Sequence, residues 1–226
     1  MIENINKYIE HTVLAAFATE ADVERVCTEA KKYGFASVCI NPMYVKKAAE
    51  LLAGSGVNVC TVIGFPLGAT STASKAAETE AAYADGCEEF DMVIAVGALK
   101  EGRLDYVRDD IAAVVAAAKG KTVKVIFETA YLTDEEKVTA CRLCAEAGAH
   151  FVKTCTGFST AKDAENRATV HDVVLMKASI PENMKVKASA GIRSYADAEA
   201  LILAGADRLG TSAGVKIVEG DRKSVV

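Results

Sequence analysis

The sequence predicts an α/β fold, a single-domain (β/α)8 TIM barrel that takes up residues 1–226. Short apolar, β-branched runs alternate with helical patterns from one end of the chain to the other. Glycines at 34, 86, 148 and 205 each end a helical pattern and stand directly before an apolar run. No linker-like stretch divides the 226 residues, and a barrel of this kind typically needs about 250.

The expected strands are short. They cover Tyr8–Val13, Ser37–Asn41, Val57–Ile63, Glu89–Ile94, Val123–Glu128, Phe151–Thr154, Lys185–Ser189 and Arg208–Gly210. The expected helices lie between them at Glu20–Tyr33, Tyr44–Ala53, Ala73–Asp85, Leu104–Lys119, Asp134–Ala147, Val170–Ser179 and Tyr195–Ala204, and a short helical stretch follows Gly214. Thr19, and the capping box from Thr133 to Glu136, mark two of the helix starts. Residues 219–226 are expected to be a frayed tail.

The four glycines precede the second, fourth, sixth and eighth expected strands, which suggests four related βαβα units. Right-handed crossovers between eight such strands favour a closed barrel. The alternative is an open doubly wound sheet. That fold normally carries a glycine-rich nucleotide turn after its first strand, and Glu10–Ala16 has none.

Composition and charge argue against several classes of protein. A net charge of -5 disfavours nucleic acid or an anionic membrane as the main partner. No apolar stretch approaches the about 20 residues that span a bilayer, and Met1–Glu10 lacks the apolar core of a signal peptide. Seven cysteines at irregular spacings indicate free thiols in a reducing cytosol, so a cytoplasmic protein is expected.

A metal site is not expected. The pair Cys141 and Cys144 has the spacing of zinc ligands, but it lies inside a helical pattern and no second pair completes the site. The three histidines show no spacing typical of metal ligands.

Polar residues stand where the interior of a barrel is normally apolar. Alternate strand residues face inward, and this alternation collects seven polar side chains in the expected interior. They are Glu10, Thr12, Asp91, Lys124, Glu128, Lys153 and Lys187. Each buried charge costs free energy unless it is paired, so this set predicts a functional site.

Some members of this group have a second interpretation. Lys124 and Glu128 could form a structural ion pair or belong to an outer network of the site. Asp91 could be a turn residue at a strand end. Glu89 and Lys185 come early in their strands and are expected to be partly solvated charges.

Lys153 and Lys187 lie on consecutive strands, which are about 5 Å apart in a sheet. Two close ammonium groups disfavour each other's charge, so we expect Lys153 to be a neutral amine near neutral pH. Such an amine attacks carbonyl carbons and forms Schiff bases. Asp91 could keep the other lysine charged and exchange protons with it.

The loops after the seventh and eighth strands predict an anion site. These loops, Ser189–Ser194 and Gly210–Gly214, are rich in small residues, and barrels often hold a phosphate at this place with backbone N–H groups. The alternative is that the glycines only form turns. Gly64–Gly68 is a further rim loop, and it lacks the Gly-Lys-Ser/Thr ending of a P-loop.

The chain resembles the deoxyribose-phosphate aldolases of the short bacterial type. The resemblance runs nearly end to end, through Ile9-Glu-His-Thr12, Ser37-Val-Cys-Ile-Asn-Pro42, Thr61-Val-Ile-Gly-Phe-Pro-Leu-Gly68, Asp91-Met-Val-Ile94, Lys124-Val-Ile-Phe-Glu-Thr129, Phe151-Val-Lys-Thr-Cys-Thr-Gly157, Val186-Lys-Ala-Ser189 and Gly210-Thr-Ser212. Any one of these motifs is weak evidence, but eight in the right order are specific.

The resemblance implies a cofactor-free, metal-independent lyase. Such an enzyme reversibly cleaves 2-deoxy-D-ribose 5-phosphate to acetaldehyde and D-glyceraldehyde 3-phosphate in deoxyribonucleotide catabolism. It further implies that Lys153 forms the imine while Lys187 perturbs it and shares a proton relay with Asp91. The implied substrate-binding residues are Thr12, Thr156, Gly157, Gly210, Ala190, Gly191, Ser212 and Ala213, the last four at the phosphate. A homodimer is also implied.

The chain departs from the family pattern at several positions. Glu10 stands where Asp is common, and Ala190 stands where the family has glycine. A Cβ restricts positive φ close to the expected phosphate. The tyrosine that ends some members is absent, since the last tyrosine is Tyr195. Cys39 matches a cysteine near the family's site, either an inert core thiol or a trap for reactive aldehydes.

Two other functions remain open at this level. One is a Schiff-base aldolase of the same fold that uses a ketone donor, such as dihydroxyacetone phosphate or pyruvate. The other is a non-catalytic barrel that binds a phosphorylated ligand. A covalent adduct at the lysine separates the enzymes from the binding protein.

Overall fold

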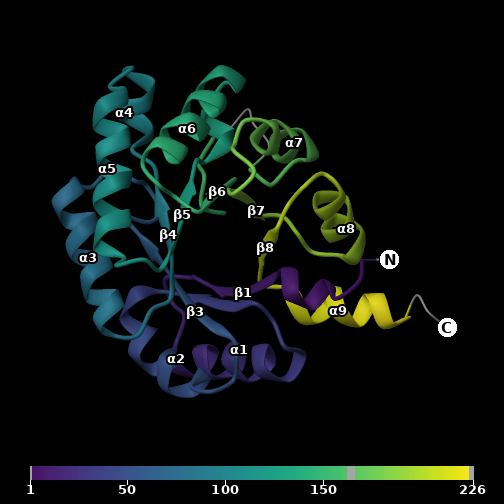
Figure 1. The fold of residues 1–226 in the computed structure, drawn as a ribbon. Helices are drawn as coiled ribbons and strands as arrows, with labels where there is room; N and C mark the ends of the chain where they lie inside the picture. Colours follow the sequence, from purple (N-terminus) through teal and green to yellow (C-terminus); the bar gives the residue numbers. More distant parts are fainter. Residues whose placement is uncertain (1, 162–165, 224–226) are drawn as a thin grey trace.

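The computed structural model describes residues 2–161 and 166–223, and it describes side chains as far as residue 220. In this part of the chain eight parallel strands, β1 to β8, pair in chain order and close into a barrel surrounded by helices (Figure 1). The strands are β1 Ile9–Val13, β2 Ser37–Ile40, β3 Asn58–Ile63, β4 Glu89–Val93, β5 Thr122–Ile126, β6 Phe151–Lys153, β7 Lys185–Ser189 and β8 Arg208–Thr211. The predicted TIM barrel is confirmed and the open sheet is excluded.

The helices follow the strands closely. They are α1 Glu20–Tyr33, α2 Val45–Leu52, α3 Thr72–Ala84, α4 Val96–Lys100, α5 Leu104–Ala117, α6 Asp134–Glu146, α7 Val170–Ala178, α8 Tyr195–Leu203 and α9 Gly214–Lys223, with 3₁₀ turns η1 Ile5–Tyr8, η2 Pro42–Tyr44 and η3 Thr129–Tyr131. The expected helix from Glu20 to Tyr33 is confirmed at both ends. The short helix α4 has no counterpart among the predicted elements.

The four helix-ending glycines adopt the left-handed conformation that was expected of them. Their φ angles are 65° at Gly34, 98° at Gly86, 79° at Gly148 and 113° at Gly205. A residue without Cβ reaches this conformation at no steric cost, so the chain leaves each helix and enters the next strand directly.

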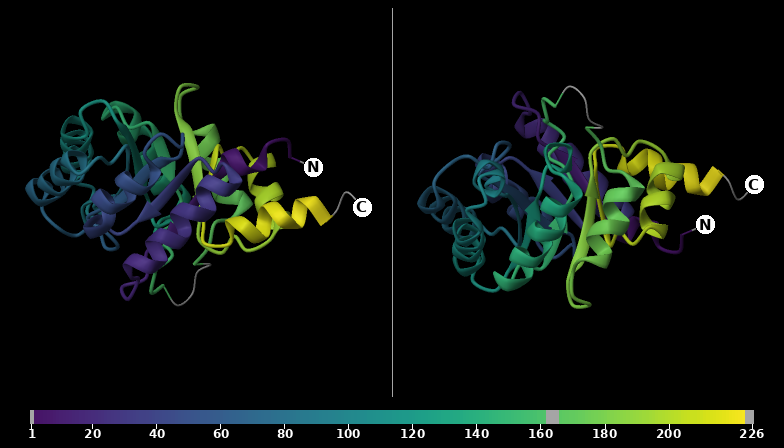
Figure 2. Two further views of the ribbon diagram at one scale, coloured as in Figure 1. Left: turned by 90° about the horizontal axis from the view of Figure 1, so that it is seen from below. Right: turned by 90° about the horizontal axis from the view of Figure 1, so that it is seen from above.

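The expected frayed tail from residue 219 is wrong for residues 219–223, which continue α9. Two physical contacts hold this helix. Ile217 and Val218 are buried in the core, and the hydroxyl of Tyr33 donates to Glu219 Oε1 at 2.6 Å. Residues 224–226 lie outside the described part. Helix α9 contacts the N-terminal η1, and Figure 2 shows the two ends of the chain on the same side of the barrel.

The main hydrophobic core lies between the barrel and the helices. Outward strand residues such as Val38, Phe90, Val125 and Val186 belong to it and are fully buried. Inside the barrel, a small apolar cluster of Cys39, Cys60 and Val62 lies beside buried charges. The inward face of the strands therefore serves the site, while the outward face supplies the hydrophobic stabilisation. Among the described residues, no helix is long and apolar enough to cross a membrane.

A buried ion pair connects α3 with α5 outside the barrel. Lys75 Nζ lies 2.6 Å from Asp110 Oδ2 and donates to the carbonyl of Val93 at 3.0 Å. The hydroxyl of Thr72 donates to Asp110 Oδ1 at 2.7 Å. Both charged side chains are almost completely excluded from water, and each needs the other.

We predict that Lys75→Met lowers the free energy of unfolding by about 3–5 kcal/mol, because Asp110 is left buried without a counter-charge. The double variant Lys75→Met/Asp110→Leu should recover most of that loss. Urea unfolding of the three proteins measures this difference. A double variant no more stable than the single one would contradict the electrostatic explanation.

Candidate active site

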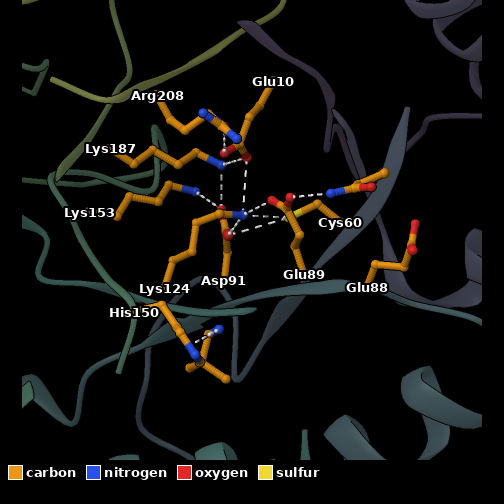
Figure 3. A network of polar contacts seen from close by, with 12 residues as sticks. Glu10, Cys60, Glu88, Glu89, Asp91, Lys124, His150, Lys153, Lys187 and Arg208 are labelled. Carbon is orange, nitrogen blue, oxygen red and sulfur yellow. Dashed lines mark hydrogen bonds and ion pairs between the residues drawn. The ribbon is translucent and has the colours of Figure 1, made fainter. Parts of the chain in front are cut away.

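The carboxylate of Asp91 is the centre of the charges inside the barrel (Figure 3). Three lysines from three strands surround it. Lys124 Nζ on β5 lies 2.9 Å from Asp91 Oδ1, and Lys153 Nζ on β6 and Lys187 Nζ on β7 lie 2.7 and 2.6 Å from Oδ2. Lys153 and Lys187 stand opposite each other in the β6–β7 register, as predicted. The two lysines therefore share one carboxylate oxygen.

Two further carboxylates balance the charge. Glu10 Oε2 contacts Lys187 Nζ and lies 3.2 Å from Lys124 Nζ. Glu89 Oε2 lies 2.6 Å from Lys124 Nζ. Arg208 Nε lies 3.8 Å from the other oxygen of Glu10, Oε1, so the cluster has three carboxylates and four basic side chains. The buried charges can persist because each lysine has an opposite partner in place of water.

The cluster changes the acidity of its members. Burial alone would raise the pKa of the Asp91 carboxyl, but the three lysines outweigh burial and hold that pKa well below its usual range. Burial lowers the pKa of Lys187, yet the charges of Asp91 and Glu10 bring it above its ordinary value. The pKa of Lys124 is raised well above its ordinary value against the same effect of burial. Lys187 and Lys124 therefore keep their protons, and Asp91 stays a carboxylate.

A cavity of ≈ 570 Å³ opens above this cluster at the carboxyl ends of the strands, and Lys153 forms part of its floor. Seven of the eight expected substrate-binding residues line it, namely Thr12, Thr156, Gly157, Ala190, Gly191, Gly210 and Ser212. Asp91 and Lys187 lie below the lining. Lys153 is thus the member of the shared pair that a ligand in the cavity would meet.

Ala213 does not line this cavity. It borders a separate hollow beside α1 and α9, and its N–H donates to the hydroxyl of Thr211 at 2.9 Å. Gly210 lines the cavity, but it also makes room for the side chain of Lys187. A Cβ at this position would lie 3.0 Å from Lys187 Cε.

The loop after β7 has two consecutive left-handed residues, Ala190 with φ 78° and Gly191 with φ 77°. A Cβ at Gly191 would lie 2.6 Å from the Cβ of Arg167, so glycine is required there. Ala190 adopts the same conformation although it has a Cβ, and this costs free energy because the Cβ lies close to the following carbonyl oxygen. Ala190 therefore adopts a positive φ although its Cβ was expected to restrict it.

The ion-pair alternative for Lys124 and Glu128 and the expected solvation of Glu89 are wrong. Lys124 does not pair with Glu128, because β5 ends at Ile126 and Glu128 turns into the left-handed region, with φ 55°. Its carboxyl contacts Thr156. Glu89 is not solvated: it is 4% exposed, and its Oε1 accepts a hydrogen bond from Asn58 at 2.8 Å. Lys185 is exposed, as expected.

Two contributors to the site escaped the sequence analysis. The thiol of Cys60 lies 3.3 Å from Asp91 Oδ1 and 3.4 Å from Lys124 Nζ. Its place opposite Cys39 in the β2–β3 register follows from strand pairing, which could have indicated it. Cys39 is buried in the inner apolar cluster, and the Cys60 thiol lowers its pKa. Phe158 lines the cavity from the loop after β6, and no local pattern marks it.

Comparison with known proteins assigns this site to a family. A model of the DeoC/LacD family aldolases matches residues 4–219. The chain belongs to this family of aldolases. It is 57% identical over 220 residues to a deoxyribose-phosphate aldolase of Streptococcus gordonii, covering 97% of this chain and 98% of the relative. It is 58% identical over 220 residues to one of Carboxydothermus hydrogenoformans, covering 96% and 94%.

Solved structures agree with this assignment. The aldolase QR15 superimposes with a TM-score of 0.91 at 39% identity, covering 100% of this chain and 98% of the other. The deoxyribose phosphate aldolase of Aeropyrum pernix, described as a unique tetramer, gives 0.88 at 34% identity, covering 98% and 92%. The resemblance inferred from the eight motifs is confirmed. Membership of an aldolase family favours an enzyme over the non-catalytic barrel.

We predict that Ala190→Gly raises the free energy of unfolding by up to about 1 kcal/mol. Glycine removes the left-handed strain, while its greater freedom in the unfolded chain offsets part of the gain. Ala188→Gly in β7 is the matched control and should be destabilising, since Ala188 is buried in an extended strand. Urea unfolding compares them, and an equal loss of stability in both variants would refute the strain at Ala190.

Proposed function

We propose that this aldolase joins acetaldehyde and D-glyceraldehyde 3-phosphate reversibly to 2-deoxy-D-ribose 5-phosphate through an imine on Lys153. One observation carries the proposal. Lys153 lies in the floor of the cavity and 2.7 Å from the carboxylate oxygen that also binds Lys187. The names of the relatives at 57 and 58% identity support deoxyribose phosphate as the sugar, and we propose deoxyribonucleotide catabolism as the use of the reaction.

The reaction needs an amine and a mobile proton. The amine of Lys153 adds to the carbonyl carbon of acetaldehyde, and the adduct loses water to give an imine. The imine loses a proton from its methyl carbon and becomes an enamine. That carbon attacks the aldehyde carbon of the second substrate, whose oxygen takes up a proton, and water then releases the product and restores Lys153.

Lys187 and Asp91 are suited to move that proton. Lys187 has two carboxylate partners and Lys153 has one, so we assign the ammonium to Lys187 and the amine to Lys153. Both nitrogens contact Asp91 Oδ2, so a proton can pass between them over one oxygen or a single bound water. Burial keeps bulk water from competing for it.

The phosphate is proposed to bind at the side of the cavity formed by the loops after β7 and β8. The backbone at Ala190 and Gly191 and the hydroxyl of Ser212 line that side, near the start of α9. Gly210 gives the space between this side and Lys187. Thr12, Thr156 and Gly157 border the rest of the sugar. Ala213 is left out of the proposal because its N–H is already bonded.

We propose further that the reaction needs no metal ion or other cofactor. Glu10, Glu89, Asp91 and Cys60 could offer ligand atoms to a cation. The ammonium of Lys124 already lies among these four groups, at 2.6–3.4 Å from each. A metal ion there would have to displace a charge that the carboxylates hold firmly.

We also propose an oligomeric state and a cell compartment for this protein. A homodimer and a reducing cytosol are expected; all seven cysteines are free and buried, which suits the second. The tetramer of the Aeropyrum pernix relative is a property of that protein.

We predict that borohydride reduction in the presence of acetaldehyde attaches one two-carbon unit to the protein, at Lys153. Mass spectrometry of the intact chain and its peptides measures the adduct, and Lys153→Met should abolish it. The adduct should persist after treatment with a chelator. Preferential trapping of a ketone donor would favour the other aldolase, and absence of any adduct would favour a ligand-binding barrel.

We predict that Lys187→Leu lowers the rate of acetaldehyde release at least a hundredfold, because the proton donor next to the imine is lost. Lys185→Leu is the matched control, since Lys185 lies two residues away on β7 and is exposed. Its rate should stay within twofold of the original. Circular dichroism confirms folding at the assay temperature, and equal rates for both variants would remove the two-lysine mechanism.

A further inference from the structure

Glu128 has an unusual backbone and a buried side chain. Its φ and ψ are 55° and 67°, in the left-handed region, and it stands between the end of β5 and η3. Its side chain is 2% exposed. A glutamate in this conformation costs free energy that glycine would avoid, and such strain persists where surrounding contacts enforce it.

The contacts of Glu128 lead to the loop that follows Lys153. The backbone N–H of Thr156 donates to both carboxyl oxygens of Glu128, at 3.4 and 3.3 Å, and the Thr156 hydroxyl donates to Oε2. The same hydroxyl accepts the N–H of Phe158 at 2.9 Å. Glu128 thus fixes the Thr156 side chain, and that side chain fixes Phe158.

This series of contacts ends at the cavity wall. Thr156, Gly157 and Phe158 all line the cavity with Lys153. The ring of Phe158 meets that of Phe65, in the loop after β3, edge to face with 5.3 Å between centroids. One buried carboxyl therefore connects the end of β5 with two rim loops that are distant in the sequence.

The Glu128 carboxyl has few other interactions among the described residues. None of the ion pairs found among the described residues includes it, although the charge of Lys153 acts on it over a longer distance. Burial raises the pKa of its carboxyl, and the bonds from Thr156 oppose that rise. The hydrogen bonds to Thr156 are therefore the main compensation for both burial and backbone strain.

We propose that Glu128 is a positioning residue that holds Thr156 and Phe158 as the wall of the substrate cavity beside Lys153. The inference rests on the proposed function, because it takes this cavity to hold the sugar phosphate. Glu128 acts through the loop, since the hydrogen bonds of its carboxyl go to Thr156 and none of those found among the described residues joins it to Lys153.

The test compares Glu128→Gly, which removes the carboxyl and relieves the strain, with Glu128→Gln, which keeps one oxygen able to accept the Thr156 N–H. Lys119→Gly is the matched control for strain relief. Lys119 is also left-handed, with φ 49°, and it is exposed in the turn before β5, at the opposite end of the barrel.

Cleavage of 2-deoxyribose 5-phosphate is measured for all four proteins. We expect Glu128→Gly to raise KM tenfold to a hundredfold, while kcat falls less than fivefold because Lys153, Asp91 and Lys187 keep their contacts. Glu128→Gln should raise KM by an intermediate factor, and Lys119→Gly should leave both constants unchanged. The melting temperature of Glu128→Gly should stay within about 5 °C of the original, since strain relief offsets the lost hydrogen bonds.

A KM within twofold of the original in Glu128→Gly would overturn the proposal, and so would a lower melting temperature with unchanged kinetics, which indicates a purely structural role. A crystal structure of Glu128→Gly provides a second readout that needs no activity. We expect Thr156 and Phe158 to be displaced in it, and an unchanged wall would refute the inference. Failure of the proposed reaction itself would be seen separately, as an unmodified Lys153 in the borohydride experiment.

Discussion

The contact between Asp91 and three lysines is the interaction on which the rest of the site depends. A single carboxylate from β4 receives Lys124 on one oxygen and both Lys153 and Lys187 on the other. Without it, three ammonium groups would face one another in a space almost free of water. With it, and with Glu10 and Glu89, each buried lysine has an opposite partner, and of the two lysines on Asp91 Oδ2 it is Lys153 that lines the cavity.

This arrangement explains why the barrel interior is polar and where stability comes from instead. The strands turn their apolar residues toward the helices, and that outer layer forms the main core. The inner face is then free to carry charge, provided that small residues leave room for long side chains. Gly210 does this for Lys187, where an added Cβ would lie 3.0 Å from the lysine stem. Packing and electrostatics are thus separated onto the two faces of one sheet.

In the rim loops, some residues with a side chain adopt strained left-handed backbone. Gly191 could not carry a side chain, because Arg167 occupies that space. Ala190 and Glu128 do carry one in left-handed backbone. The methyl group of Ala190 makes no polar contact that could offset the strain, whereas the carboxyl of Glu128 forms hydrogen bonds with the loop beside Lys153. The two positions therefore differ in what a substitution to glycine would remove.

The sequence by itself determined the barrel, its helix ends and the group of Lys153, Lys187 and Asp91. Strand alternation and helix-capping glycines are local properties, and neighbouring strands fix which lysines stand side by side. Only the tertiary structure decided which carboxylate each lysine meets, since those contacts cross the barrel and depend on its closure. The clearest case is Glu128: alternation places it beside Lys124, but alternation holds only while the chain is extended, and the left-handed turn after β5 sends its carboxyl to Thr156 instead.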